Sequence, residues 1–395
     1  MVLKLIVRFL WETDRKCLRK FMYNLVWKSI WTFRKFNKRR KKGELFPAFQ
    51  FISVTDNCNL TCQGCWVTQG EKSTELSVDQ VNNIIYDSKK TGSYFFGILG
   101  GEPLMYKPLF DIFNCHPDCY FQLFTNGTLL SEDVAKKLKM AGNVTPLISF
   151  EGDENVADIR RGGTEVYKKT VKALEICQRN KLIAGVAISV CKSNLEMALS
   201  DEFIRMIWNR GASYLWYYIF RPGGSNPSFE LALEREEIDR LRYFMVHART
   251  RHPIILIDAY WGADGKPFCP AVEGLSHHIG PSGYIEPCPV IQLAKDSING
   301  RDLNQVYQNS IFLREFKKEV AGLTNGCIFM ENPGWLNAFA SRYSAVNTSN
   351  RPDYNEDLKH AIKTISHGSS KQIPEKSRIY KFAKKKAFFG LGAYG

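Results

Sequence analysis

Six apolar segments that alternate with helix-like segments most strongly limit what this chain can fold into. Runs of β-forming residues predict strands at 49–55, 94–99, 120–125, 146–150, 183–190 and 214–220. The helices that we expect after them cover 77–90, 108–114, 131–140, 164–179, 195–210 and 234–250. Strands that alternate with helices favour a parallel sheet with helices outside. Six such units predict an α/β fold, a partial (β/α)6 TIM-like barrel that is open on one side.

Polar residues, glycines and cysteines follow the predicted strands directly. Three cysteines follow the first strand, Gly100 to Glu102 follow the second, Asn126 follows the third, Ser149 ends the fourth and Cys191 ends the fifth. In parallel α/β sheets the working groups lie at the carboxyl ends of the strands. The sequence therefore predicts one site that is built from several strand ends.

Basic residues are concentrated at the two ends of the chain, whose net charge is +14. Residues 1–42 hold fourteen Lys and Arg against Glu12 and Asp14, and residues 371–386 hold seven against Glu375, so the body of the chain is mildly acidic. We expect four parts: a basic amphipathic helical segment (1–46), the partial barrel (47–255), a smaller accessory region (256–350) and a basic C-terminal tail (351–395).

Residues 1–42 have the pattern of a basic amphipathic helix with interleaved tryptophans. Helices of this type lie on anionic membrane surfaces, so one expectation is a peripheral membrane contact through residues 1–42. The alternative is a helix that packs on the chain's own body or on a protein partner. Nucleic acid is a weaker alternative, because no recognisable nucleic-acid module accompanies the helix. No apolar run approaches the roughly 20 residues that span a bilayer.

Cysteines 58, 62 and 65 stand close together, and no other Cys or His lies between Trp66 and Asn114. Eleven cysteines without an export signal indicate a reducing compartment, so we expect a cytoplasmic protein, peripheral at the inner membrane surface if residues 1–42 bind there. A structural zinc ion needs four ligands. A cubane of four irons is compatible with three thiolates and one open iron.

The spacing Cys58-x3-Cys62-x2-Cys65, followed by Gly100-Gly101-Glu102-Pro103 at the next strand end, resembles the radical S-adenosylmethionine (radical SAM) enzymes over about residues 48–250. The resemblance implies a [4Fe–4S] cluster on the three cysteines and S-adenosylmethionine on the open iron. One electron from the cluster cleaves the sulfonium and gives a 5′-deoxyadenosyl radical, which removes hydrogen from a substrate. A protein electron donor such as flavodoxin or ferredoxin would supply the electron.

The resemblance also implies roles for residues around the cluster. Gly100, Gly101 and Glu102 would present backbone acceptors to the methionine amino group. Asn126 and Ser149 would line the ribose and carboxylate region. Arg161, next to Arg160, would pair with the methionyl carboxylate. Many members carry an aromatic residue before the last cysteine; Gly64 stands there in this chain, and Trp66 is the expected substitute.

A second cysteine set lies in the accessory region, at Cys269, Cys288 and Cys327. Cys269, with Gly283 and Cys288, resembles the first part of a SPASM or twitch extension, which holds auxiliary iron–sulfur clusters in many radical SAM enzymes. The Cys-x2-Cys pair of a full extension is absent, so at most one auxiliary cluster is expected. The alternatives are a metal-free region with buried thiols and a zinc site that uses His277 or His278. Cys191 is a weak catalytic candidate, as a hydrogen donor or a fourth ligand.

The leading expectation is a radical SAM enzyme of the oxidoreductase or maturase type that acts on a peptide or protein. A lipid or membrane-associated substrate is the alternative suggested by the basic ends. A non-catalytic metal-binding protein, tethered by those ends, is the rival from another class.

Overall fold

The computed structural model describes residues 2–324, 326–368 and 371–386. Among them, nine strands form one curved sheet in the order β7-β6-β5-β4-β3-β2-β1-β8-β9. The parallel strands of the barrel are β1 (Phe49–Ser53), β2 (Phe95–Leu99), β3 (Tyr120–Thr125), β4 (Val144–Ser149), β5 (Ala184–Val190), β6 (Ala212–Ile219) and β7 (Ile255–Ile257). The predicted partial barrel is confirmed, with a short seventh strand added at one edge.

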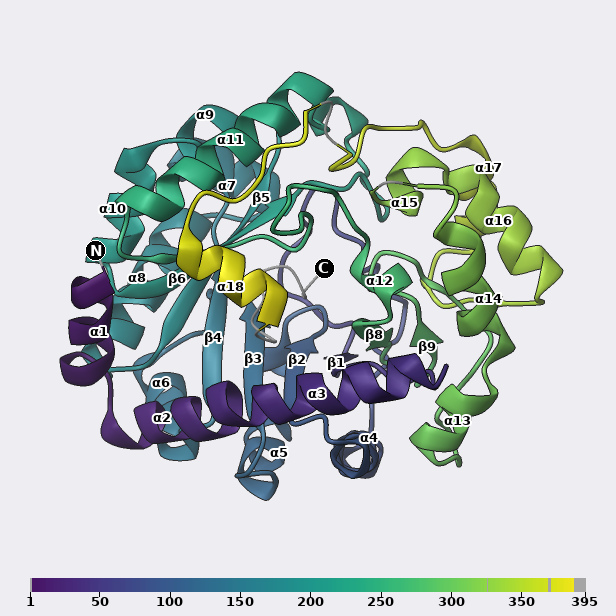
Figure 1. Cartoon of the computed structure of the whole chain (residues 1–395), viewed down its shortest axis with the longest axis horizontal. Coiled ribbons are helices and arrows are strands. Elements are labelled where there is room, and N and C mark those ends of the chain that lie inside the picture. Colours follow the sequence, from purple (N-terminus) through teal and green to yellow (C-terminus); the bar gives the residue numbers. More distant parts are fainter. Residues whose placement is uncertain (1, 325, 369–370, 387–395) are drawn as a thin grey trace.

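Helices cover the outer side of these strands (Figure 1). They are α4 (Val78–Thr91), α5 (Leu109–Cys115), α6 (Glu132–Ala141), α7 (Glu154–Arg161), α8 (Val166–Arg179), α9 (Leu195–Ala198), α10 (Asp201–Asn209) and α11 (Arg235–Arg251). The helix predicted at 77–90 is present as α4, and Ser77 and Gln80 form a capping box at its start. The single helix predicted at 195–210 is wrong: it is divided into α9 and α10, because the Ser200 hydroxyl caps a new helix by accepting from Phe203 N–H.

The accessory region extends the same sheet beyond β1. Strand β8 (Ser276–Ile279) pairs in parallel with β1, and β9 (Ile285–Glu286) returns antiparallel to β8. The two strands form a hairpin, with Gly283 at φ 79° in its turn. The remaining elements are α12 (Pro270–Glu273), β10 (Leu293–Ala294), α13 (Leu303–Asn309), α14 (Ile311–Val320), α15 (Ile328–Glu331), α16 (Pro333–Arg342), β11 (Val346–Asn347) and α17 (Tyr354–His360).

The N-terminal segment packs along the amino ends of the barrel strands (Figure 1). It consists of α1 (Val2–Trp11), α2 (Arg15–Lys20), a π-helical segment η1 (Phe21–Trp27) and α3 (Lys28–Lys41). Leu25 and Phe36 enter the cluster of apolar side chains inside the barrel, which includes Phe49 and Trp216. Packing on the chain's own body, one of the alternatives from the sequence, is therefore present.

The C-terminal part is also anchored. Helix α18 (Arg378–Lys386) places Tyr380 in the same interior cluster, and the Tyr380 hydroxyl accepts a hydrogen bond from Leu256 N–H of β7 at 2.9 Å. Within the described ranges, we find no helix with the length and apolar character needed to cross a bilayer.

Candidate active site

The cysteine loop joins β1 to α4 and is closed by Asp56. The Asp56 carboxylate accepts from Thr74 N–H at 2.8 Å, from the Ser73 hydroxyl at 3.1 Å and from the Asn350 amide at 2.8 Å. These bonds join the two ends of the loop and tie it to the accessory region. Cys58 to Cys65 therefore lie on a loop whose two ends are held together by hydrogen bonds.

Gly100 and Gly101 lie directly against the start of the cysteine loop. Gly101 N–H donates to the Thr55 carbonyl at 2.8 Å, and a Cβ on Gly101 would stand 2.2 Å from the Asn57 oxygen. A Cβ on Gly100, whose φ is 158°, would stand 2.5 Å from the Thr55 oxygen. Glycine is required here because two backbones approach closely. The sequence predicted a close approach by a ligand; the approach visible in the structure is by the cysteine loop itself.

The Glu102 side chain joins the ends of β2 and β3. It is fully buried and accepts from Asn126 N–H at 2.7 Å, the Thr125 hydroxyl at 2.8 Å and Leu104 N–H at 3.0 Å. Burial raises the pKa of Glu102, and these three donors oppose the shift. The carboxylate therefore holds the ends of β2 and β3 together. The predicted contact with the cofactor depends on the backbone of Glu102 and not on this side chain.

Asn126 holds the cysteine loop from the end of β3. Its amide nitrogen donates to Asn59 Oδ1 at 2.9 Å and lies 4.0 Å from the sulfur of Cys58. Its oxygen accepts from Thr128 N–H at 2.9 Å and from the Thr128 hydroxyl. These bonds fix the side chain beside the first predicted iron ligand.

Two arginines at the end of α7 share the buried carboxylate of Glu151. Arg161 Nη2 donates to Glu151 Oε1 at 2.5 Å, and its Nη1 lies 3.8 Å from the sulfur of Cys62. Arg160 donates to the other Glu151 oxygen at 3.2 Å and turns to Cys191, 2.6 Å from its sulfur. Of the two candidates, Arg161 is the one that reaches the cysteine loop.

Two adjoining cavities open among these residues. The larger, about 620 Å³, is in the size range of small-molecule sites. The smaller, about 280 Å³, extends toward the accessory region. The larger cavity is lined by Cys58, Cys62, Cys65, Trp66, Gly100, Gly101, Asn126, Ser149 and Arg161, among others. All the residues predicted to bind the cofactor therefore line this cavity, except Glu102.

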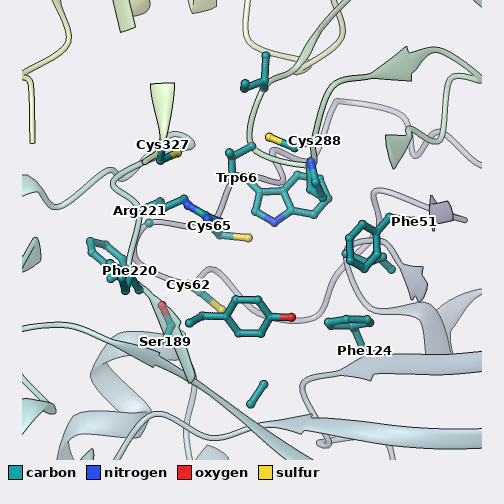
Figure 2. Close-up of a pocket in the computed structure, with 18 of the residues that line it drawn as sticks. Phe51, Cys62, Cys65, Trp66, Phe124, Ser189, Phe220, Arg221, Cys288 and Cys327 are labelled. Atoms are coloured by element: carbon teal, nitrogen blue, oxygen red, sulfur yellow. The ribbon is translucent and has the colours of Figure 1, made fainter. Parts of the chain in front are cut away.

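The smaller cavity is where the two cysteine sets meet. Figure 2 shows Cys62 and Cys65 on one side and Cys288 and Cys327 on the other, with Trp66 between them. Cys269 lines the same cavity. Side chains from the strand ends complete its wall, namely Phe51, Phe124, Ser189, Tyr218 and Phe220.

Both sets contain thiols whose pKa is raised by burial. Burial raises the pKa of Cys58 to about 11 and that of Cys65 to about 12. Burial likewise raises the pKa of Cys269 to about 11. Such thiols are protonated at neutral pH, and iron binding would replace their protons.

The donor set fits an iron–sulfur cluster better than zinc. Among the described residues, no three Cys, His, Asp or Glu side chains converge closely enough to hold a single metal ion. Thiolates that bind separate corners of a cubane stand farther apart than the ligands of one zinc ion. His277 stacks on Tyr307, His278 bonds to Ser53 and Glu286, and neither lines the cavity of the accessory cysteines, so the structure lends no support to the zinc alternative that used these histidines.

Cys191 lies outside both cavities. Its side chain is fully buried beneath Arg160 and lies 3.1 Å from the Ser193 hydroxyl. This position gives the thiol no open path to a bound substrate, so it lends no support to the predicted catalytic role.

Trp66 lines both cavities and packs edge-on against His278, with ring centroids 5.3 Å apart. Gly64, at φ 70°, is covered by Phe220: a Cβ at position 64 would stand 2.1 Å from that ring. The aromatic group beside the last cysteine thus comes from the end of β6.

Sequence reasoning missed Phe220 and Arg221, which follow β6 directly. Arg221 projects toward the cavity between the two cysteine sets (Figure 2). Burial opposes its charge, but Tyr260 and the three accessory cysteines raise the pKa of its guanidinium overall. The rule that site residues follow strand ends, applied to the sixth strand, would have found both.

Comparison with known proteins points to the same family for the barrel as the cysteine spacing does. The family model described as the Radical SAM superfamily matches residues 52–194. The AdoMet-dependent heme synthase of Methanosarcina barkeri is 29% identical over 148 residues, which cover 36% of this chain and 42% of that protein. The chain therefore spans less than half the length of that relative.

Two further proteins match a longer part of the chain. The mycofactocin maturase MftC of Mycobacterium tuberculosis is 25% identical over 291 residues, 69% of this chain and 74% of that protein. The crystal structure of Streptococcus suis SuiB bound to the precursor peptide SuiA superimposes with a TM-score of 0.61 at 15% identity, over 72% of this chain and 70% of that chain. This likeness shows that the fold of the barrel is shared.

Proposed function

We propose that this chain, which belongs to the radical SAM superfamily through its domain at residues 52–194, cleaves S-adenosylmethionine reductively and modifies a peptide or protein. The observation that carries the proposal is the larger cavity. It gathers three thiols on one loop with two backbone glycines, an amide and a guanidinium, all at the carboxyl ends of parallel strands. Members of the superfamily use a [4Fe–4S] cluster and S-adenosylmethionine.

The chain's own residues would hold and orient these groups. Cys58, Cys62 and Cys65 would ligate three irons, and the fourth iron and the bound S-adenosylmethionine would supply a 5′-deoxyadenosyl radical. Arg161, oriented by Glu151, would pair with the methionyl carboxylate. The backbones of Gly100 and Gly101 would accept from the amino group, with Asn126, Ser149 and Trp66 along the rest of the molecule.

A peptide substrate is supported by the relatives and by the smaller cavity. SuiB has been crystallised with a precursor peptide, and MftC is named a maturase. The smaller cavity joins the cysteine loop to the accessory region and is lined in part by aromatic side chains. A side chain that enters it would lie beside Cys65 and Trp66, which also line the larger cavity.

An auxiliary iron–sulfur cluster on Cys269, Cys288 and Cys327 is part of the proposal. All three side chains line one cavity, and burial, together with the neighbouring Cys327, raises the pKa of Cys288 and of Cys269. The three thiolates of such a cluster would then face the guanidinium of Arg221. One ligand position of such a cluster would stay open.

The partners are proposals as well. Flavodoxin or ferredoxin would supply the electron, in a reducing compartment that suits eleven free cysteines. A peripheral membrane contact through residues 1–42 is supported by the aromatic side chains that this segment leaves exposed.

The test is anaerobic reconstitution with iron and sulfide, then addition of dithionite and S-adenosylmethionine. The proposal predicts 5′-deoxyadenosine, and its loss in Cys62→Ala. A reconstituted, iron-loaded chain that forms none would favour the non-catalytic metal-binding alternative.

A further inference from the structure

Helix α1 docks on the barrel through its charged side. Arg8 is only 6% exposed, and its guanidinium lies over the Trp208 ring, 3.4 Å from the centroid. It donates to the carbonyls of Trp208 and Ala212, at 2.8 and 2.9 Å, and to Glu12 at 2.9 Å. Phe9 packs beside it against the interior apolar cluster. Arg8 and this one aromatic ring, rather than the rest of the apolar residues of α1, therefore fix the helix to the body of the protein.

The apolar side of α1 consequently faces solvent. Leu3 is 72% exposed and Trp11 is 71% exposed. Between them the helix also exposes Ile6, Val7 and Leu10. Burying such side chains is worth about 25 cal/mol per Å² of apolar surface, so a helix normally turns them inward. A contiguous apolar face that is left outward indicates an interaction site.

The long helix that follows, from α2 to α3, presents a second exposed row. Its inner side is tied to loops that precede the strands: the Asn24 amide donates to the carbonyls of Pro117 and Cys119, and Thr32 donates to Gly92. Its outer side carries large apolar residues and then cations, namely Met22, Tyr23, Trp27, Ile30, Trp31, Arg34, Lys35, Lys38, Arg40, Lys41 and Lys42.

We propose that these two faces form one docking surface for an anionic membrane leaflet. The tryptophans and leucines would enter the interfacial region, and the net +12 of residues 1–42 would attract acidic headgroups. The exposed aromatic side chains and the cations beside them lie along one helix axis. This arrangement fits a planar boundary, where the aromatic rings meet the lipid and the cations meet the headgroups. We name the exposed side chains of residues 3–42 the leaflet surface.

Docking through the leaflet surface would determine which way the two cavities face relative to the membrane. The helices cover the amino ends of the strands (Figure 1). Both cysteine sets and Arg161 line the two cavities, which open among the residues that follow the carboxyl ends of the strands. A chain docked in this way turns its cavities toward the aqueous side. The substrate would therefore reach the site from solution, which favours a peptide over a lipid within the bilayer. This orientation rests on the proposed function; the docking itself does not.

The first experiment is co-sedimentation of the full-length chain with vesicles of phosphatidylcholine alone or mixed with phosphatidylglycerol. We expect pelleting with the anionic vesicles that falls as salt rises. The double variant Trp27→Glu/Trp31→Glu should bind at least about tenfold more weakly. Ile311→Glu on α14, equally apolar and 62% exposed but outside the leaflet surface, should bind as the parent chain does.

Orientation is tested by oxidative footprinting of the vesicle-bound chain. Trp27 and Trp31 should be protected, while Tyr243 on α11, 58% exposed, should stay reactive. A parent chain that remains in the supernatant with both vesicle types, or a double variant that pellets equally, overturns the proposal and points to a protein partner. The double variant should still form 5′-deoxyadenosine in vesicle-free solution, so failure of docking is separate from failure of the enzymatic proposal.

Discussion

Arg161 links the carboxylate of Glu151 to the sulfur of Cys62, with Nη2 donating to Glu151 at 2.5 Å and Nη1 lying 3.8 Å from the sulfur. Glu151 is 4% exposed and also receives Arg160. One buried carboxylate thus pairs with two guanidinium groups beside the predicted cluster, which leaves this group of three side chains with a net positive charge. Its charge keeps Arg161 in a fixed position from which the guanidinium faces the larger cavity.

Glu151→Gln should weaken S-adenosylmethionine binding about tenfold, or roughly 1.4 kcal/mol, while iron content is retained. The amide leaves the two arginines without their shared negative charge, so Arg161 loses its fixed orientation. Anaerobic equilibrium dialysis of the reconstituted variant measures the change. Glu154→Gln, an exposed neighbour on α7 that pairs with Lys168, is the matched control and should bind normally. Equal affinities for both variants would contradict the positioning role.

Gly101→Ala should destabilise the cysteine loop by about 2–4 kcal/mol and lower the iron that the chain retains. The new Cβ would stand 2.2 Å from the Asn57 oxygen, and backbone atoms cannot move aside as a flexible side chain can. Thermal unfolding and iron analysis measure both effects. Gly322→Ala has no atom within 4 Å of its Cβ and should leave both unchanged. A Gly101→Ala chain with normal stability would show that the loop tolerates a shift.

Cys327→Ser should lower the iron content from about eight to about four atoms per chain. The variant removes one of the three accessory thiols and leaves the loop of Cys58 intact, so 5′-deoxyadenosine formation should persist. Cys115→Ser, which changes an exposed thiol away from both cavities, should retain about eight irons. About four irons in the parent chain would mean that the accessory set binds no cluster.

The free energy of unfolding should rise with pH above neutrality, in part through Lys384. Burial lowers the pKa of Lys384 to about 7, although Asp258 lies 3.0 Å away and opposes the shift. Because the folded pKa is below the ordinary value, the unfolded chain binds the extra proton between about pH 7 and 10. Stability from this group therefore rises across that window, by at most about 1.4 kcal/mol per pH unit.

Lys384→Met removes this titration while it keeps the apolar stem packed. The difference in melting temperature between pH 7 and about pH 9.5 should be smaller in the variant than in the parent chain. Identical pH dependence in the two chains would show that Lys384 stays charged in the folded state.

Most of the barrel could be predicted from the sequence because local signals coincide there. The strand at 120–125 is found at its predicted bounds, and the helix expected from the Ser77 capping box begins at Val78. The rule that chemistry follows strand ends also placed the cysteines, the glycines and Asn126 in one region. These features depend on neighbours a few residues apart.

Features that depend on distant neighbours could not be predicted. Strand β8, with its two histidines, pairs with β1 across more than 200 residues. Nothing in the neighbouring sequence shows that Phe220 covers Gly64 or that the Arg8 guanidinium lies over the Trp208 ring. The periodicity of α1 predicts an amphipathic helix but not which face packs, and the face that packs is the charged one.

The most direct test of the account is the electron paramagnetic resonance spectrum of the dithionite-reduced, reconstituted chain before and after addition of S-adenosylmethionine, recorded on Cys327→Ser so that only the cluster of Cys58, Cys62 and Cys65 contributes. The account predicts a [4Fe–4S] signal that changes when S-adenosylmethionine is added, because one iron has no protein ligand. A cluster signal that is unchanged by S-adenosylmethionine would contradict it.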